Sequence, residues 1–259
     1  MNNRHTRGLV LCVSDYSESD KIVTFFSPDM GRVTGIAKGA KRSKKRFVNK
    51  LEEFSLLQIM YRPARRRGLL LVSEAELENA FLGLRYSYSA YVAAMYAVEL
   101  ALRLTREQDP DPGIFALLVW AMQALDRQHD PLEVAALFHL KILGASGYEP
   151  QLAQCGRCGE PVRQGTGYAL DADSGFLLCG SCREDVHGGA AALSVQTIRF
   201  MQHAQRLDVN NLARLRLPRR NAMEVLGNLQ RYSRYLLQHD IIAWHQIRQL
   251  PSLFTSPAR

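Results

Sequence analysis

Four cysteines in this chain have the type and spacing that bind a metal ion. Two residues separate Cys155 from Cys158, two separate Cys179 from Cys182, and twenty residues lie between the pairs. One tight turn can present two thiolates, so two such turns supply the four ligands that Zn²⁺ takes in a closed tetrahedral site. A closed site has no open position for a catalytic water. The spacing therefore predicts one structural Zn²⁺.

Other cysteine chemistry is less well supported by the sequence. His187 follows the second pair and is an alternative ligand, although its position also suits a surface histidine. Five cysteines in 259 residues are too few for a secreted disulfide scaffold, which favours metal binding in a reducing compartment. Cys12 stands alone in an apolar stretch, and we expect it to be a small core residue.

Carboxylates close to the cysteines raise the alternative of a metal-dependent nuclease. Asp171 and Asp173 precede the second pair, and Glu184 and Asp185 follow it. Turn formation accounts for the first two carboxylates and helix-end charge for the other two. We therefore predict that the chain is not an enzyme.

A second kind of chemistry, the binding of polyanions, is indicated by residues 31–50. This segment has no acidic side chain. Such runs also occur as solvated loops, but here strand-like segments lie on both sides, which favours a nucleic-acid-binding surface on a folded scaffold. The predicted phosphate contacts are Arg32, Lys38, Lys41, Arg42, Lys44, Lys45, Arg46 and Lys50, together with Arg65, Arg66 and Arg67 of a second cluster that begins at Arg62.

The charge is unevenly distributed. Residues 1–67 hold 15 basic and six acidic side chains, residues 68–150 hold five and 11, and residues 151–259 hold 13 and eight. Phosphate binding is expected mainly in the first part, while the acidic middle part is better suited to protein contacts.

The sequence has no apolar run of membrane-spanning length, and its start lacks a hydrophobic signal region, so we expect a cytoplasmic protein. The segment that begins at Gly35 departs from the ATP-binding P-loop pattern at two positions, Ala40 and Arg42. We therefore expect the protein to act on nucleic acid without using ATP.

The elements that must position these residues are predicted from periodicity and turn residues. Strand-like stretches cover residues 7–13, 21–26, 32–37, 54–61 and 69–77. Five short strands with a long third connection favour a partly open barrel of the oligonucleotide/oligosaccharide-binding (OB) type, and a β-sandwich fragment is the alternative. The connection over residues 38–50, here called the basic loop, and the loop 62–68 would both be exposed. Phe47 and Tyr61 adjoin the two basic clusters and are candidate base-stacking rings, or else core residues.

The rest of the chain is predicted to be helical around a small zinc module, which makes the whole an α+β multidomain protein. Helices are expected over residues 88–104, 114–128, 131–143, 195–206 and 221–237. Asp130, Pro131 and Glu133 form a capping-box pattern, and residues 168–170 and 176–178 read as a hairpin. The predicted domains are an OB domain (1–80), a helical domain in two parts (81–150 and 189–259) and a zinc-ribbon-like module between them (151–188). Arg214, Arg216, Arg219 and Arg220 either extend the phosphate-binding surface or form a solvated helix end.

Several stretches of this sequence resemble the bacterial RecO family of DNA repair and recombination mediator proteins. They are DKIVTFFSPDMGRVTGIAKGAKRSKKRF at residues 20–47, GYEPQLAQCGRC at 147–158 and LQRYSRYLLQHDI at 229–241. The resemblance covers nearly the whole chain in the right order. It implies an N-terminal OB fold, a helical domain and an inserted zinc-binding module.

The resemblance also implies a function that the residues alone do not show. Members of the family bind single- and double-stranded DNA, anneal complementary strands, and with RecR load RecA onto DNA coated by single-stranded DNA-binding protein (SSB), whose acidic C-terminal tail they engage. A bacterial, nucleoid-associated location follows from this role. Some members lack the four cysteines, so zinc is not essential to the shared function. The alternative hypothesis is an RNA- or ribosome-associated protein, because barrels and zinc modules are also common on RNA.

Overall fold

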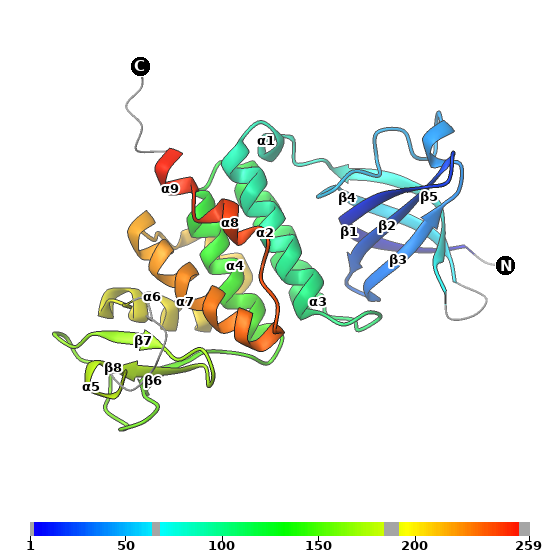
Figure 1. The fold of residues 1–259 in the computed structure, drawn as a ribbon. Helices are drawn as coiled ribbons and strands as arrows, with labels where there is room; N and C mark the ends of the chain where they lie inside the picture. The colour runs from blue at the N-terminus through cyan, green and yellow to red at the C-terminus, as the bar shows by residue number, and fades with distance from the viewer. Residues whose placement is uncertain (1–2, 64–67, 184–191, 254–259) are drawn as a thin grey trace, which may run out of the picture.

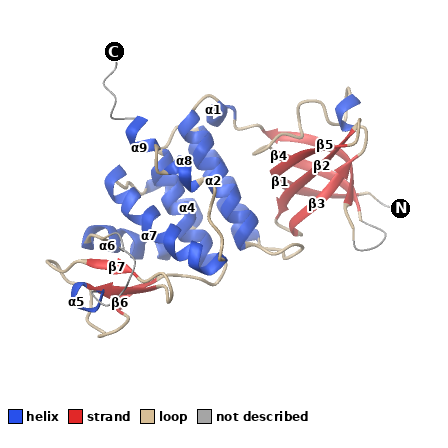
Figure 2. Ribbon diagram, viewed as in Figure 1, coloured by secondary structure: helices blue, strands red, loops and turns tan. Residues whose placement is uncertain are grey.

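The computed structural model describes residues 3–63, 68–183 and 192–253 as a β-barrel, a helical bundle and a small three-stranded module (Figure 1). The barrel is formed by the N-terminal part of the chain and lies beside the bundle, while the small module lies against another part of the bundle. Figure 2 shows that strands are confined to the barrel and the module, and that helices make up most of the bundle between them.

The barrel confirms the predicted OB-type fold and excludes a sandwich fragment. Its strands lie within three residues of the predicted bounds and are hydrogen-bonded in the order β1-β2-β3-β5-β4. Parallel pairing of Gly35–Ala37 with Leu70–Val72 joins β3 to β5 and closes the barrel, which was predicted to be partly open. The strands are β1 (Arg4–Tyr16), β2 (Asp20–Ser27), β3 (Gly31–Ala37), β4 (Leu56–Arg62) and β5 (Leu70–Asn79).

The bundle contains every predicted helix, together with shorter ones. Its buried residues form one apolar cluster that also includes Leu9, Phe26 and Phe54 from the barrel side. The helices are α1 (Leu82–Arg85), α2 (Tyr88–Leu104), α3 (Pro112–Asp126), α4 (Pro131–Ala145), α6 (Val195–Arg206), the 3₁₀ helix η2 (Val209–Arg214), α7 (Arg219–Leu237), α8 (Trp244–Ile247) and α9 (Leu250–Leu253). Among the described residues, no helix is both long and apolar enough to cross a membrane.

Helix α4 begins where the sequence predicted, but its capping box is only half formed. The Asp130 carboxylate accepts hydrogen bonds from the backbone N–H groups of Leu132 and Glu133. The Glu133 side chain is buried and accepts from the backbone N–H of Leu217 at 2.5 Å instead of returning to Asp130. Glu133 therefore ties α4 to the segment before α7, a long-range contact that the local pattern did not predict.

The small module comprises β6 (Gln151–Cys155), β7 (Tyr168–Leu170), β8 (Phe176–Cys179) and the short helix α5 (Gly180–Arg183). β7 and β8 form the predicted antiparallel hairpin, and β6 adds to the free edge of β8 in parallel. The strand order β6-β8-β7 brings the first cysteine pair, which follows β6, next to the second pair at the end of β8. Pairing of these strands thus positions the metal ligands.

The barrel and the bundle meet through the β2–β3 turn and the loop between α2 and α3. Gly31 has φ of +67°, and a Cβ at this position would collide with the backbone of Asp109, so only glycine fits the turn. The next residue, Arg32, accepts a hydrogen bond at its carbonyl from the backbone N–H of Gln108 at 2.9 Å. Phe54 packs edge-on against Tyr91 of α2 with ring centroids 5.3 Å apart. The two parts therefore share a continuous junction.

Candidate nucleic-acid interface and metal centre

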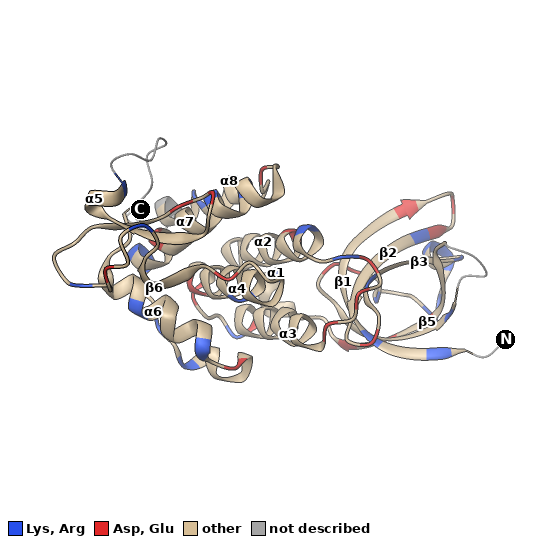
Figure 3. Ribbon diagram, turned by 90° about the horizontal axis from the view of Figure 1, so that it is seen from below, with Lys and Arg blue, Asp and Glu red and all other residues tan. Residues whose placement is uncertain are grey.

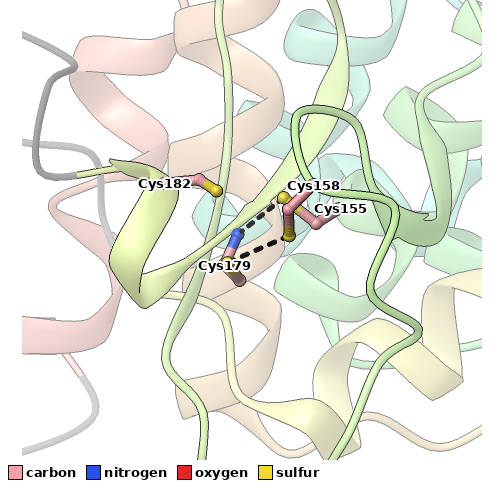
Figure 4. A group of neighbouring side chains, drawn as sticks. All are labelled: Cys155, Cys158, Cys179 and Cys182. Carbon is pink, nitrogen blue, oxygen red and sulfur yellow. Dashed lines mark hydrogen bonds between the residues drawn. The ribbon is translucent and has the colours of Figure 1, made fainter.

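The four predicted metal ligands are brought together by the module. The Sγ atoms of Cys155, Cys158, Cys179 and Cys182 all lie within 4.8 Å of one another, and Figure 4 shows them converging from β6, its following turn, the end of β8 and α5. The Sγ atoms of Cys158 and Cys179 are 3.8 Å apart. Four thiolates around Zn²⁺ at about 2.3 Å form a tetrahedron with edges of about 3.8 Å. The cluster therefore fits a tetrahedral metal ion.

The backbone around the cluster favours the thiolate form of Cys155. The N–H of Cys179 donates to the Cys155 Sγ at 3.4 Å. Burial raises the pKa of the Cys155 thiol, but hydrogen bonds from the backbone N–H groups of Cys158, Cys179 and Arg157 outweigh it and lower that pKa to about 6. The side-chain hydrogen bond to Cys179, followed by desolvation, raises the pKa of Cys182 to about 12. Without a metal ion, the four sulfurs cannot all be thiolates because their negative charges repel one another. A bound cation would remove this repulsion.

The module is fixed to the bundle through α7. The backbone N–H of Leu170 donates to the Asn228 side chain at 3.2 Å, and Asn228 in turn donates to the Glu224 carbonyl at 2.9 Å. Gly175 in the β7–β8 turn has φ of +72°, and a Cβ there would lie 2.6 Å from the Tyr232 hydroxyl. These contacts attach the module to the surface of the bundle.

The basic loop is a folded part of the barrel. Ala40, Phe47 and Leu51 are buried in the same cluster as the barrel residues Val10 and Val23. The loop contains the 3₁₀ helix η1 (Ala40–Arg42), and the Ala75 N–H of β5 donates to the Arg46 carbonyl at 3.4 Å. Three apolar side chains therefore anchor a segment whose cations point outward.

The cations of the basic loop differ in their partners. Lys41 lies 3.0 Å from the Asp15 carboxylate, and Arg42 lies 3.4 Å from Glu18. Arg46 donates to the carbonyls of Ser73 and Lys38 and lies over the Phe47 ring, and Lys50 donates to the carbonyls of Lys45 and Arg46. Lys38, Lys44 and Lys45 are exposed and form no ion pair with the part of the chain that the structure describes. These three are the cations most available to an external anion.

Two other groups of predicted phosphate contacts are placed differently. The Arg32 guanidinium lies at the junction with the bundle, where it donates to the Thr105 carbonyl at 3.1 Å and lies 3.9 Å from Glu107. It is therefore engaged by the helical part of the chain. Arg65, Arg66 and Arg67 lie outside the described residues, and their contribution stays a prediction.

Neither aromatic ring suggested for base stacking is accessible. Phe47 is 3% exposed and Tyr61 is 7% exposed, because both side chains fill the barrel core. The alternative that they are core residues is therefore correct. Among the described residues of the barrel, the exposed aromatic side chain is Tyr16 at the end of β1. The sequence pattern missed it because the first strand was predicted to stop at Val13, and the real strand continues for three residues.

The structure also settles several smaller predictions. Cys12 is exposed, not a core residue, because a bulge between Val10 and Cys12 changes which side chains of β1 face inward. The Asp171 carboxylate accepts from the backbone N–H and hydroxyl of Ser174, which confirms its role in the turn. His187, Glu184 and Asp185 lie outside the described residues.

The arginines before and in α7 are largely engaged within the bundle. Arg219 lies 2.7 Å from Asp130, Arg220 lies 3.9 Å from Glu224, and Arg216 lies 3.8 Å from the buried Glu133. These contacts favour a helix-end role for this cluster. Figure 3 shows basic and acidic positions interspersed along both the barrel and the helical part of the ribbon.

Two family profiles match the chain. One, described as "Recombination protein O N terminal", matches residues 1–81, and the other, "Recombination protein O C terminal", matches residues 85–244. The boundary between the two matches coincides with the passage from the barrel to the bundle, and the second match includes the four cysteines.

Curated proteins named "DNA repair protein RecO" are similar to this chain over most of its length. The protein from Syntrophobacter fumaroxidans is 32% identical over 216 residues, which are 83% of this chain and 85% of the relative. That from Dehalococcoides mccartyi is 27% identical over 235 residues, 91% of each chain. That from Anaeromyxobacter dehalogenans is 39% identical over 181 residues, 69% of this chain and 70% of the relative.

Proposed function

The chain belongs to the RecO family of DNA repair proteins, and from this premise we propose that it is an ATP-independent mediator that binds DNA through its basic loop. Membership supports a role in DNA repair. The observation that carries the finer proposal is the loop itself, in which buried Phe47 and Leu51 hold exposed Lys38, Lys44 and Lys45 on an ordered surface. A cationic surface of this kind attracts the phosphates of a nucleic acid whatever its base sequence, and it lowers the electrostatic repulsion between two strands.

The further steps are proposed on the basis of the family. Annealing of complementary strands follows from binding both strands at once, and loading of RecA on SSB-coated DNA requires RecR and the SSB tail as partners. The acidic middle part of the chain, with 11 acidic and five basic side chains over residues 68–150, suits contacts with such proteins better than contacts with DNA. We place this activity at the bacterial nucleoid and assign it no catalytic step.

The metal proposed for the cysteine cluster is one Zn²⁺. Cys155, Cys158, Cys179 and Cys182 would hold it with four sulfurs, a ligand set that suits zinc and leaves no open coordination position. When bound, the ion supplies charge neutralisation and cross-links the two turns of the module.

The DNA-binding proposal is tested by the salt dependence of binding. Lys38→Gln, Lys44→Gln and Lys45→Gln together remove three exposed cations, and the expected loss is about 100-fold in single-strand affinity at 0.1 M salt, with a salt slope lower by about 2. The matched control is Arg199→Gln, Arg206→Gln and Arg248→Gln, which removes the same charge from exposed sites on the helical part. Equal losses in both variants, or a flat salt dependence, would overturn the assignment.

The mediator proposal is tested by annealing of two complementary oligonucleotides without ATP, first bare and then coated with SSB. Acceleration in both cases is expected. Acceleration of bare strands alone would contradict the engagement of SSB, and a preference for RNA in competition with DNA of equal length and sequence would favour the RNA-associated alternative.

A further inference from the structure

We propose that Tyr16 is a base-stacking ring, which makes this side of the basic loop selective for single-stranded nucleic acid. The inference rests on the proposed DNA binding by the basic loop and adds the ring that phosphate contacts alone do not supply. A cationic surface binds duplex and single strands alike, whereas a ring that stacks on a base requires that the base be free.

Exposure singles out Tyr16. Its side chain is 52% exposed, and every other aromatic side chain of the described barrel residues is buried: Phe25, Phe26, Phe47, Phe54 and Tyr61. An aromatic ring at the end of a strand, half in solvent, has no role in the apolar core. It presents a π-face that any of the four bases can cover.

The backbone places Tyr16 beside the basic loop. Tyr16 pairs with Asp20 at the β1–β2 turn, and the Asp20 carboxylate accepts a hydrogen bond from the Gly39 N–H at 2.8 Å. That hydrogen bond, first, and one from Ser19 lower the pKa of Asp20, so the carboxylate that ties turn and loop together is ionised. This hydrogen bond therefore connects the turn to the loop.

Lys41 makes the second connection between the turn and the loop. Its backbone N–H donates to the Ser19 carbonyl at 2.9 Å, and its Nζ donates to the Ser17 carbonyl at 3.0 Å. A cation is thus held at the residue that follows Tyr16. Lys41 therefore ties the loop to the turn beside Tyr16.

The charges around the β1–β2 turn indicate which path a bound nucleic-acid strand would follow. Asp15 and Glu18 flank the ring and pair with Lys41 and Arg42, so this edge of the surface is close to neutral. Lys38, Lys44 and Lys45, which form no ion pair with the described residues, lie on the remainder of the loop. We therefore expect the base to lie on Tyr16 while most of the backbone follows these three lysines.

The test compares Tyr16→Ala with Tyr16→Phe in the full-length protein on single-stranded and duplex DNA. Tyr16→Ala should bind single strands about five-fold or more weakly and duplex DNA as the wild type does, with an unchanged salt slope because stacking releases no counter-ions. Tyr16→Phe should retain single-strand binding. Tyr86→Ala, at a tyrosine that is 87% exposed beside α1, is the matched control and should bind as the wild type does.

An abasic strand separates stacking from every other effect. Such a strand keeps the phosphates but has no bases, so wild type and Tyr16→Ala should bind it equally. An equal loss on abasic, single-stranded and duplex DNA would show that the ring only supports the loop, and would overturn the inference. Wild-type binding of single strands by Tyr16→Ala would also overturn it, while failure of the Lys38, Lys44 and Lys45 variant to lose affinity would instead contradict the proposed function.

Discussion

In the barrel the buried polar side chains are the hydroxyls of Thr6, Ser27 and Ser55, whereas the helical part buries ionisable Glu133 and His139 as well. The barrel carries seven cations on its basic loop, and Lys38, Lys44 and Lys45 form no ion pair with described residues. The helical part instead uses charged and polar groups inside: the Tyr96 hydroxyl lies 2.8 Å from His139, whose second ring nitrogen lies 2.7 Å from the Ser233 hydroxyl.

The difference indicates a division of work. Surface cations cost little desolvation and remain available to an external polyanion, which suits binding. Buried polar groups must be satisfied internally, and when they are, they specify one arrangement of α2, α4 and α7. The barrel therefore exposes cations to an external ligand, whereas the buried polar groups of the helical part stabilise one arrangement of its helices. The predictions below test this contrast.

The largest effect is expected from the metal ligands. Cys182→Ser should remove bound zinc and the hydrogen-exchange protection of residues 151–183, because metal binding contributes of order 10 kcal/mol to the folding of small zinc modules. The barrel should keep its protection. Elemental analysis should give one zinc per wild-type chain and far less in the variant. Cys12→Ser, at an exposed barrel cysteine, is the control, and zinc loss there would contradict the assignment.

A smaller loss of folding stability is expected when the apolar anchor of the basic loop is removed. Phe47→Ala deletes a ring that is 3% exposed and should lower the free energy of unfolding of the barrel by about 3–5 kcal/mol. The loop should then become accessible to trypsin, and DNA affinity should fall although no charge is lost. Val48→Ala, at the neighbouring side chain that is 46% exposed, should change neither property. Denaturant unfolding and limited proteolysis measure the two effects, and an intact, protected loop in Phe47→Ala would show that it needs no apolar anchor.

The buried histidine predicts a pH dependence of the helical part. Desolvation lowers the pKa of His139 to about 3, below its ordinary value of 6.5, so between these values the unfolded chain binds a proton that the folded chain does not. The free energy of unfolding should therefore fall with decreasing pH, by about 1.4 kcal/mol per unit from this group.

His139→Gln tests that dependence. The variant should show a shallower decline of stability between pH 6 and pH 4 than the wild type. Both tryptophans, Trp120 and Trp244, belong to the helical part, so their fluorescence follows its unfolding. His5→Gln, at an exposed position of β1, should keep the wild-type slope. Parallel declines in wild type and His139→Gln would contradict the assignment.

The smallest effect is expected from the exposed ion pair of the barrel. Glu18→Gln frees Arg42, with which it is paired at 3.4 Å, and should raise DNA affinity about two- to three-fold at low salt, because exposed pairs contribute little and release a cation readily. The gain should disappear at high salt. Glu107→Gln, which lies beside Arg32 at the junction, is the matched control and should leave affinity unchanged. A gain that persists at high salt would exclude an electrostatic origin.

Much of the fold was predictable from local pattern. Strand periodicity located all five strands of the barrel, and Asp130, Pro131 and Ser194 marked helix starts that the structure confirms. The spacing of the four cysteines predicted their convergence. These features depend on residues close together in sequence, where turn geometry and capping decide the outcome.

The errors have a common origin in long-range packing. Cys12 was expected in the core because it stands in an apolar stretch, but a bulge in β1 places its side chain on the exposed side. Glu133 was expected to close a capping box, but the backbone of Leu217, 84 residues away, offers its N–H instead. Long-range packing also places the Arg32 guanidinium at the bundle, and its contact with phosphate stays a prediction.

The sequence by itself determined which four cysteines converge, where the strands and helices lie and where the positive charge is concentrated, because residue type and local spacing specify them. Only the tertiary structure decided which of those charges are free and which ring is exposed. Phe47 and Tyr61 entered the core because the closed barrel needs large apolar side chains, and Tyr16 remained outside because β1 extends beyond that core. Exposure of a side chain depends on how the whole chain packs, so no local sequence pattern determines it.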